Sequence, residues 1–167
     1  VTNKNVIIFH THTCESYTPT PENSYEATGN FRTTDLNYNV AKVGDELKKY
    51  LTSYGFNVVH NTTYHDYPTY SNSYGRSLKT VAEVLKQNPN TDIIIDLHRD
   101  AIGNDKYAPK VKIGDDYCAQ IMFVIGSNLG GLKHDNWIKN LSYAIKIQEK
   151  ANEIYPGLFK TMIVRNS

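Results

Sequence analysis

Three short segments rich in β-branched and other apolar residues constrain the fold of this chain most strongly. They are NVIIFH at residues 5–10, FNVVHN at 56–61 and DIIIDL at 92–97. Nearly unbroken apolar runs, as in the first and third segments, are typical of strands that are buried on both faces. Such strands occur in parallel sheets whose faces are covered by helices, so we expect a sheet of this kind.

Two amphipathic helices are predicted between these strands. Apolar residues recur at helical spacing across residues 36–53, and Gly55 follows as a stop signal. A similar pattern from Leu78 to Leu85 predicts a second helix that ends near Asn88. The alternation of strand and helix predicts an α/β fold with right-handed crossovers and a mostly parallel sheet flanked by helices.

The rest of the chain continues this pattern. Strands are expected at 110–113 and 120–125, flanking a Gly-Asp-Asp turn, with a long third helix at 134–154 and a last strand at 161–165. We see no internal repeat and no linker, and 167 residues suffice for one well-packed domain. A single domain is therefore expected over residues 1–167.

Composition excludes several classes of protein. Eighteen Lys and Arg residues against seventeen Asp and Glu give a net charge of +1, so no basic field is present to attract nucleic acid. The apolar runs are far shorter than the roughly 20 residues of a membrane helix. The chain begins at Val1, and we expect any membrane anchor to lie outside this sequence. Only two cysteines, Cys14 and Cys118, occur, which excludes a four-cysteine zinc site and leaves a disulfide open.

Histidines follow two of the predicted strands at the point where each strand ends. His10 and His12 follow the first strand, with Glu15 three residues after His12, and His98 follows the third strand. Ligands of open α/β sheets bind at the carboxyl ends of the strands, so these side chains are expected to meet. Three protein ligands with a fourth position open for water are typical of catalytic zinc sites. The sequence therefore predicts a zinc site formed by His12, Glu15 and His98.

Neighbouring residues have supporting or alternative roles. His10 is expected in the core or as an outer partner that orients a ligand, and direct ligation by His10 stays open. Asp96 is expected to accept an N–H from His98 or, as the alternative, to cap the end of its strand as a structural residue. Arg99 is a candidate for binding a substrate carboxylate or an oxyanion, with an ion pair to a nearby acid as the alternative. A thiol hydrolase built on Cys14 and His98 is a competing hypothesis. The remaining histidines are expected in core or surface positions: His60, His65 and His134.

Five segments, taken in order, resemble one known family. They are HTHTCESY, LNYNVAKVGDELKKYL with YGFNVVHN, DYPTYSNSYGRS, IIIDLHRDA and YPGLFKTM. Together they are similar to the stage II sporulation protein P family from about residue 5 to residue 166. The resemblance implies a zinc-dependent N-acetylmuramoyl-L-alanine amidase with endopeptidase activity on peptidoglycan stem peptides, acting during forespore engulfment. It also implies a fold similar to zinc amidases and zinc carboxypeptidases, with His12, Glu15 and His98 as the zinc ligands.

The same resemblance implies a location and partners. It implies an extracytoplasmic protein at the septum or forespore surface, held by an N-terminal membrane anchor. Its implied partners are peptidoglycan and other engulfment proteins, including a glycan-cleaving sporulation protein. Family members continue into a final segment with a glutamate that acts as general base, and no residue of this chain matches it. We therefore expect a catalytic domain that lacks this segment. A non-catalytic peptidoglycan-binding or scaffold module and a zinc carboxypeptidase for small peptides are the alternatives.

Overall fold

The structure is a computed structural model and describes residues 3–101 and 107–166 of the chain. These residues belong to two units, Val1–Ala101 and Ile102–Ser167. The expectation of one catalytic domain over the whole chain stays a prediction. Among the described residues, no helix combines the length and the hydropathy that crossing a membrane requires.

A three-stranded parallel sheet forms the centre of the first unit. Its strands are β1 (Asn5–Phe9), β2 (Asn57–His60) and β3 (Ile93–Asp96), in the order β2-β1-β3. The three middle residues of β1 are each no more than 2% exposed. The prediction that the first strand is buried on both faces is therefore confirmed.

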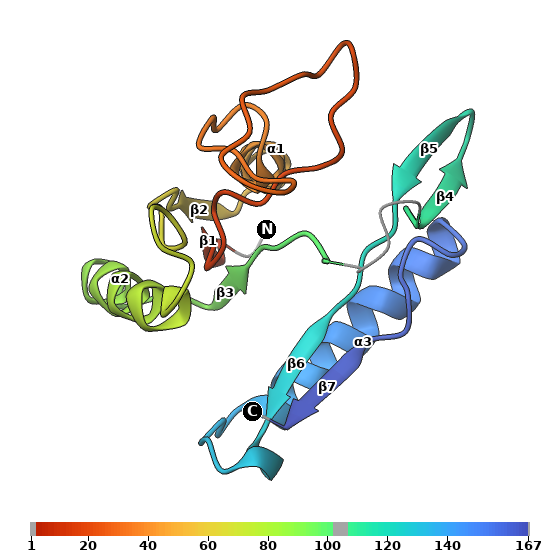
Figure 1. Ribbon diagram of the computed structural model, residues 1–167. Coiled ribbons are helices and arrows are strands. Elements are labelled where there is room, and N and C mark those ends of the chain that lie inside the picture. Colours follow the sequence, from red (N-terminus) through yellow and green to blue (C-terminus); the bar gives the residue numbers. More distant parts are fainter. Residues whose placement is uncertain (1–2, 102–106, 167) are drawn as a thin grey trace. The chain divides into compact units, whose positions relative to one another are not determined.

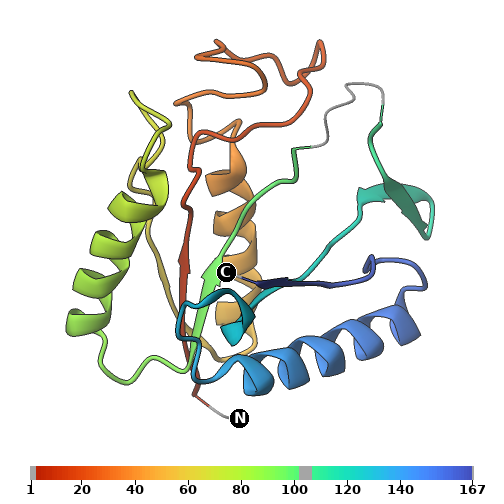
Figure 2. The same cartoon turned by 60° about the horizontal axis from the view of Figure 1, so that its bottom comes forward.

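Two helices connect these strands. Helix α1 (Val40–Ser53) joins β1 to β2, and helix α2 (Ser73–Gln87) joins β2 to β3. The two crossovers lead to opposite sides of β1, so right-handed connections place the two helices on opposite faces of the sheet. Figure 1 and Figure 2 show this arrangement, with α1 and α2 on either side of the strands. The prediction of an α/β architecture is confirmed.

Helix α1 begins later than residue 36, where the apolar spacing places its start. The side chain of Asn39 accepts a hydrogen bond from Ala41 N at 3.0 Å, and its Nδ2 donates to Thr33 O at 3.1 Å. An asparagine in this position satisfies one of the free N–H groups of the first turn and defines the helix start. Leu36 matches the helical spacing but lies in the preceding turn.

Strand β3 is less buried than its apolar sequence predicts. Ile93 is 42% exposed and Ile94 is 44% exposed. Among the described strands, β3 pairs only with β1 and forms an edge of the three-stranded sheet. The prediction of a fully buried third strand is wrong because the number of neighbouring strands, rather than the residues of a strand, determines its burial.

The second unit contains two small sheets and one long helix. Strands β4 (Lys110–Ile113) and β5 (Asp116–Ala119) form an antiparallel hairpin. Strands β6 (Val124–Ser127) and β7 (Ile163–Asn166) pair in parallel, and helix α3 (Trp137–Ile154) connects them after a short 3-10 turn.

The predicted strand at 120–125 is wrong in its boundaries. Ile113 pairs with Asp116, so the hairpin turn consists of Gly114 and Asp115 and its second strand begins at once. Gly114 has a φ of 60°, a conformation that favours glycine at the first position of such a turn. Because the turn is tight, residues 116–119 form β5, and the apolar run contributes to β6 only from Val124 onward.

Gly44 allows close packing between α1 and the sheet. A Cβ atom on this residue would lie 2.5 Å from His60 Nε2 and 3.0 Å from His10 Nε2. Both imidazoles are almost fully buried, with 2% of the His60 side chain and none of His10 exposed. The absence of a side chain at Gly44 is therefore what lets the two rings lie against the helix.

We expect Gly44→Ala to lower the free energy of unfolding by roughly 1–3 kcal/mol, because an added methyl group overpacks this contact. The net change should be a loss of stability, although alanine stabilises an isolated helix by about 1 kcal/mol relative to glycine. Urea denaturation measures the effect. Lys48→Ala, at an exposed position of the same helix, serves as the control and should stay within about 0.5 kcal/mol. A Gly44→Ala protein as stable as the parent would show that the imidazoles move aside without cost.

Candidate metal centre

The carboxyl ends of β1 and β3 bring the two histidine segments together. Phe9 pairs with Asp96, and Leu97 N donates to Phe9 O at 2.9 Å. The Asp96 carboxylate accepts hydrogen bonds from Thr11 N at 2.8 Å and from Thr11 Oγ1 at 2.6 Å. These contacts fix the segment that follows β1 beside the segment that carries His98.

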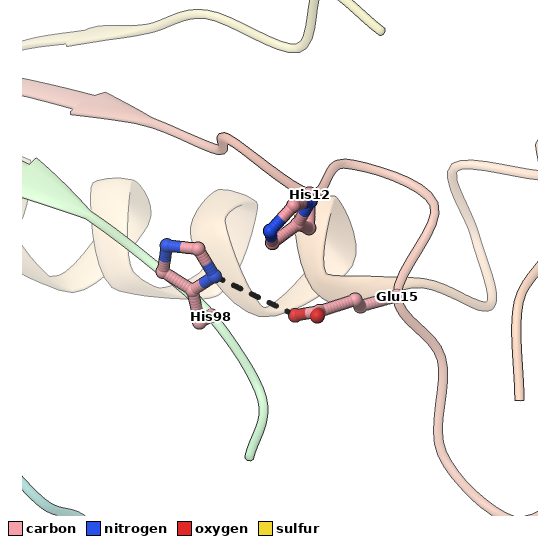
Figure 3. A group of neighbouring side chains, drawn as sticks. All are labelled: His12, Glu15 and His98. Atoms are coloured by element: carbon pink, nitrogen blue, oxygen red, sulfur yellow. Dashed lines mark ion pairs between the residues drawn. The ribbon is translucent and has the colours of Figure 1, made fainter. Parts of the chain in front are cut away.

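His12, Glu15 and His98 form one cluster of side chains. One candidate ligand atom from each residue lies within 4.8 Å of the other two. Glu15 N donates to His12 O at 3.1 Å, which closes a turn. Figure 3 shows the side chains facing a common point, two of them from the segment after β1 and one from the segment after β3. The structure thus brings together the three residues that the sequence predicts as zinc ligands.

The two ring nitrogens of His98 face different carboxylates. Nε2 lies 2.9 Å from Asp96 Oδ2, and Nδ1 lies 3.7 Å from Glu15 Oε2. Burial by itself lowers the pKa of His98, but hydrogen bonds with Asp96 and Glu15 raise it to about 10. Asp96 lies where the sequence predicts it, holding Nε2 so that Nδ1 faces Glu15.

His12 is buried, and one of its ring nitrogens has no partner. Its Nδ1 makes no hydrogen bond within the described part of the chain, and it lies 3.9 Å from Asp66 Oδ2, beyond hydrogen-bond distance. Its Nε2 lies 3.2 Å from the Tyr70 hydroxyl. Burial lowers the pKa of His12, which keeps the imidazole neutral and leaves a lone pair for a metal.

This set of donor atoms fits a zinc ion. Zinc binds imidazole nitrogen and carboxylate oxygen, and catalytic zinc sites use three such ligands. A buried polar atom without a partner costs about 1–3 kcal/mol, a cost that a bound metal would remove at His12 Nδ1. A ring nitrogen of His12, the Glu15 carboxylate and Nδ1 of His98 are the atoms that would hold the ion.

Arg99 lies beside the cluster, but backbone carbonyls occupy its guanidinium. Its Nε donates to Ser16 O at 2.9 Å and its Nη2 donates to Phe31 O at 3.0 Å. Its backbone N donates to Glu15 Oε2 at 3.2 Å. In this arrangement Arg99 anchors both ends of the loop after Glu15, and a contact between its guanidinium and substrate stays a prediction.

His10 lies in the core, outside the cluster. Its Nδ1 donates to Leu97 O at 2.8 Å, and its Nε2 lies 2.8 Å from His60 Nε2. Burial lowers the pKa of His10 to about 4. The neutral ring therefore holds the carbonyl of the residue before His98, which agrees with the expectation of a core or orienting residue.

Comparison with known proteins gives the family of this chain. A family model described as Stage II sporulation protein P (SpoIIP) matches residues 1–167. The chain belongs to the stage II sporulation protein P family. The protein of that name from Bacillus subtilis (strain 168) is 31% identical over an alignment of 163 residues, and the match covers 93% of this chain and 38% of the relative. Membership in this family implies a role in sporulation.

The chain spans less than half of the length of the Bacillus subtilis relative. No solved structure matches the chain. The expected similarity to the folds of zinc amidases and zinc carboxypeptidases therefore stays a prediction.

Sequence reasoning missed Asp66, a buried carboxylate in this member of the family. Asp66 is 4% exposed, accepts a hydrogen bond from Cys14 N at 3.2 Å and pairs with the guanidinium of Arg32. Its segment follows β2, whose carboxyl end lies at the same edge of the sheet as those of β1 and β3. Applying the strand-end rule to β2 as well would have pointed to this segment.

Tyr70, from the same segment, was also missed. Its ring stacks on that of His12, with 4.6 Å between the ring centroids and an interplanar angle of 8°. Tyr74 contacts the same imidazole edge to face, with 5.4 Å between centroids. The segment after β2 therefore supplies an aromatic wall to the cluster, and its tyrosines carry no spacing that marks such a role.

The two most strongly shifted histidine pKa values predict how the stability of the metal-free protein depends on pH. The unfolded value is 6.5, whereas folded His10 has a pKa of about 4 and folded His98 a pKa of about 10. The unfolded chain therefore binds more protons at His10 as the pH falls below 6.5, and stability falls with it. The contribution of His98 is complete below pH 6.5 and is lost as the pH rises towards 10.

Urea denaturation in EDTA should therefore show a maximum of stability near pH 6.5. His98→Gln should flatten the alkaline side of this profile and leave the acidic side in place. Stability of the parent protein that rises steadily from about pH 6.5 to about pH 9 would contradict the assignment.

Burial also predicts an unreactive Cys14. This residue is 1% exposed, and burial together with the nearby Asp66 carboxylate raises the pKa of its thiol to about 12. Both cysteines are free thiols. In a Cys118→Ser protein at about pH 8, we expect iodoacetamide to modify Cys14 at least about 100-fold more slowly in the folded than in the unfolded chain. Mass spectrometry follows the reaction, and rapid labelling of the folded protein would restore the hypothesis of a thiol hydrolase.

Proposed function

We propose that this chain carries the zinc site of a peptidoglycan hydrolase, an N-acetylmuramoyl-L-alanine amidase with endopeptidase activity on stem peptides. The observation that carries this proposal is the cluster of His12, Glu15 and His98 in a member of the stage II sporulation protein P family, in which the buried Nδ1 of His12 has no partner within the described part of the chain. Two imidazoles and one carboxylate are the ligand set of many zinc enzymes that cleave amide bonds.

The chemistry divides between the metal and the residues of the chain. Zinc, when bound, lowers the pKa of a water ligand to about 7 and polarises the carbonyl of the scissile amide. Asp96 orients the His98 ring through Nε2, and Arg99 N holds the Glu15 carboxylate. The chain thereby fixes the directions of the ligand atoms before a substrate arrives.

The general base of the reaction is expected from a residue outside the described part of the chain. Glu15 belongs to the ligand set. Asp66 is engaged by Arg32 and Cys14 N, and Asp96 is engaged by His98 and Thr11. A missing base typically costs about 10²- to 10⁴-fold in rate. The described residues alone are therefore expected to bind zinc better than they hydrolyse peptidoglycan.

Cleavage of an internal amide is favoured over carboxypeptidase activity. A carboxypeptidase needs a cation that binds the terminal carboxylate of its substrate, and a planar guanidinium suits this task best. The two arginines beside the cluster have protein partners, Arg99 with two backbone carbonyls and Arg32 with Asp66. The occupied guanidinium groups support an amidase or endopeptidase.

A non-catalytic peptidoglycan-binding or scaffold module is the second candidate function. Asp66 and Asp96 are both paired within the protein, so neither carboxylate is free to activate water. This pairing favours the non-catalytic module. Such a module would use the metal only for stability, and mutation of the ligands would leave its affinity for cell walls unchanged.

The setting of this activity is also part of the proposal. We propose that the protein acts outside the cytoplasm at the septum or forespore surface during engulfment, attached to the membrane by an anchor outside this sequence. Peptidoglycan is its proposed substrate. Other engulfment proteins, including one that cleaves glycan strands, are its proposed partners. Family membership in sporulation supports this setting.

Loss of a ligand should remove both zinc and activity. In the full-length protein, we expect His12→Ala, Glu15→Gln and His98→Ala to weaken zinc binding by more than the roughly 10- to 100-fold that loss of an orienting partner costs. Zinc content is measured by elemental analysis, and activity by the release of muropeptides from purified sacculi. Glu83→Gln, at an exposed position of α2, is the matched control for Glu15→Gln and should retain both zinc and activity.

The products distinguish the candidate functions. Mass spectrometry should find free stem peptides from an amidase and cleaved cross-links from an endopeptidase, whereas a carboxypeptidase releases single amino acids. A full-length parent protein that binds no zinc, or ligand variants that release muropeptides at the parental rate, would refute the proposal. Unchanged binding to sacculi without any product would support the scaffold module.

A further inference from the structure

We propose that Asp45 and His60 are positioning residues for the proposed zinc site, acting through His10 on the backbone before the ligand His98. This inference rests on the proposed function and deepens it, because neither residue belongs to the zinc ligand set. His60 Nδ1 lies 3.0 Å from Asp45 Oδ1, and its Nε2 lies 2.8 Å from His10 Nε2. His10 Nδ1 then donates to Leu97 O at 2.8 Å. Three hydrogen bonds thus connect helix α1 with the peptide group between Leu97 and His98.

The groups at the two ends of this chain determine the direction of each hydrogen bond. A carbonyl oxygen can only accept, so His10 Nδ1 carries a proton. Burial lowers the pKa of His10 to about 4, so the ring is neutral and its Nε2 accepts from His60. An ionised Asp45 also only accepts, so His60 donates through Nδ1 as well. An imidazolium therefore lies between a carboxylate and a neutral imidazole.

The two imidazoles meet through their edges, as a hydrogen bond between ring nitrogens requires. Their planes differ by 74°, and their centroids are 5.1 Å apart, which exceeds the distance between the two nitrogens by about one ring diameter. Both nitrogens therefore lie close to the line that joins the centroids, and each points at the other in the plane of its ring. None of His10 and 2% of the His60 side chain is exposed, so water does not compete for this contact.

The chain ends on the peptide group that places the backbone of His98. Leu97 N donates to Phe9 O at 2.9 Å and Leu97 O accepts from His10, so both polar backbone groups of Leu97 are held. The ring of His98 is held separately, by Asp96 at Nε2. Backbone and ring of this ligand thus have different partners. Asp45 and His60 supply the outer part of the backbone support, and they connect it to helix α1.

Substitutions at His60 and Asp45 in the full-length protein test this role. His60→Leu removes both hydrogen bonds of the ring. We expect it to raise the dissociation constant for zinc by about 10-fold, the lower end of the range for partners of metal ligands, because His60 acts through His10. Asp45→Ala should raise the constant less. Asp45→Asn should restore most of the affinity, since its amide oxygen still accepts from His60 Nδ1. Competition with a chromophoric chelator measures each constant.

Two further variants are the controls. Glu46→Gln changes the exposed carboxylate next to Asp45 in the sequence, and it should bind zinc like the parent. Val6→Ala creates a cavity near the start of β1, at the end of the strand away from His10, where the side chain is 2% exposed. It should lower stability in urea with EDTA and leave zinc affinity unchanged. A purely structural role of His60 predicts the same result for His60→Leu.

Nitrogen-15 NMR of the parent reads the direction of the hydrogen bonds. At about pH 6, His10 should be neutral with its proton on Nδ1, whereas His60 should carry protons on both ring nitrogens. Asp45→Ala should shift the Nδ1 resonance of His60 strongly. Because the Asp45 side chain is 55% exposed, this variant is expected to fold even where His60→Leu does not.

Three results would overturn the inference. A proton on Nε2 of His10 in the parent would contradict the direction of the chain. Zinc affinities of Asp45→Ala and of folded His60→Leu equal to that of the parent would contradict the positioning role and would leave the proposed zinc site intact. A parent protein that takes up no zinc would refute the proposed function and, with it, this role. Zinc binding without peptidoglycan hydrolysis, weakened by His60→Leu, would support the inference independently of the reaction.

Discussion

The candidate metal centre depends on the parallel pairing of β1 with β3. His12 and Glu15 follow one of these strands and His98 follows the other, so the chain must bring together segments about eighty residues apart. Closing so long a loop costs conformational entropy, which the buried sheet offsets through its apolar residues and backbone hydrogen bonds. The register matters as much as the pairing. A shift of one residue would turn the side chain of Asp96 to the opposite face of the sheet, away from Thr11 and from the His98 ring that it orients.

Charged groups around the cluster are paired within the protein, which lets them stay buried at the end of the sheet. An ionised side chain in this position is costly unless hydrogen bonds or an opposite charge compensate for the lost water. Asp66 meets this requirement through Arg32, and Asp96 through Thr11 and His98. Nδ1 of His12 is uncharged and differs from these groups, because it has no partner in the described part of the chain. A nitrogen without a partner beside a second imidazole and a carboxylate is what a metal site would offer before an ion binds.

The proximity of His12, Glu15 and His98 could be predicted from the sequence because its information is local. The strands of a parallel sheet all end at the same edge. A histidine or glutamate that follows such a strand closely must therefore lie near the carboxyl end of the sheet. The same rule points to the segment after β2 but not to Asp66 or Tyr70 within it, since they lie several residues beyond the end of β2 in a loop without periodicity. The path of that loop is set by contacts between distant segments, such as the hydrogen bond from Thr13 Oγ1 to Thr63 O. The exposure of β3 was mispredicted for a related reason, because burial depends on neighbouring strands.

The two histidines of the cluster differ in the partner of Nε2, and this difference bears on the charge of a metal centre. His98 faces the carboxylate of Asp96, whereas His12 faces the neutral hydroxyl of Tyr70. A carboxylate partner makes an imidazole a more basic ligand and returns negative charge to the ion, while a hydroxyl fixes the ring with less transfer of charge. Together with Glu15, two carboxylate partners would place three negative groups around one divalent ion. If one histidine has a neutral hydroxyl instead of a carboxylate as its partner, a bound ion would keep more of the positive charge with which it polarises a carbonyl. Asp66, the carboxylate close enough to alter this balance at His12, is neutralised by Arg32 instead.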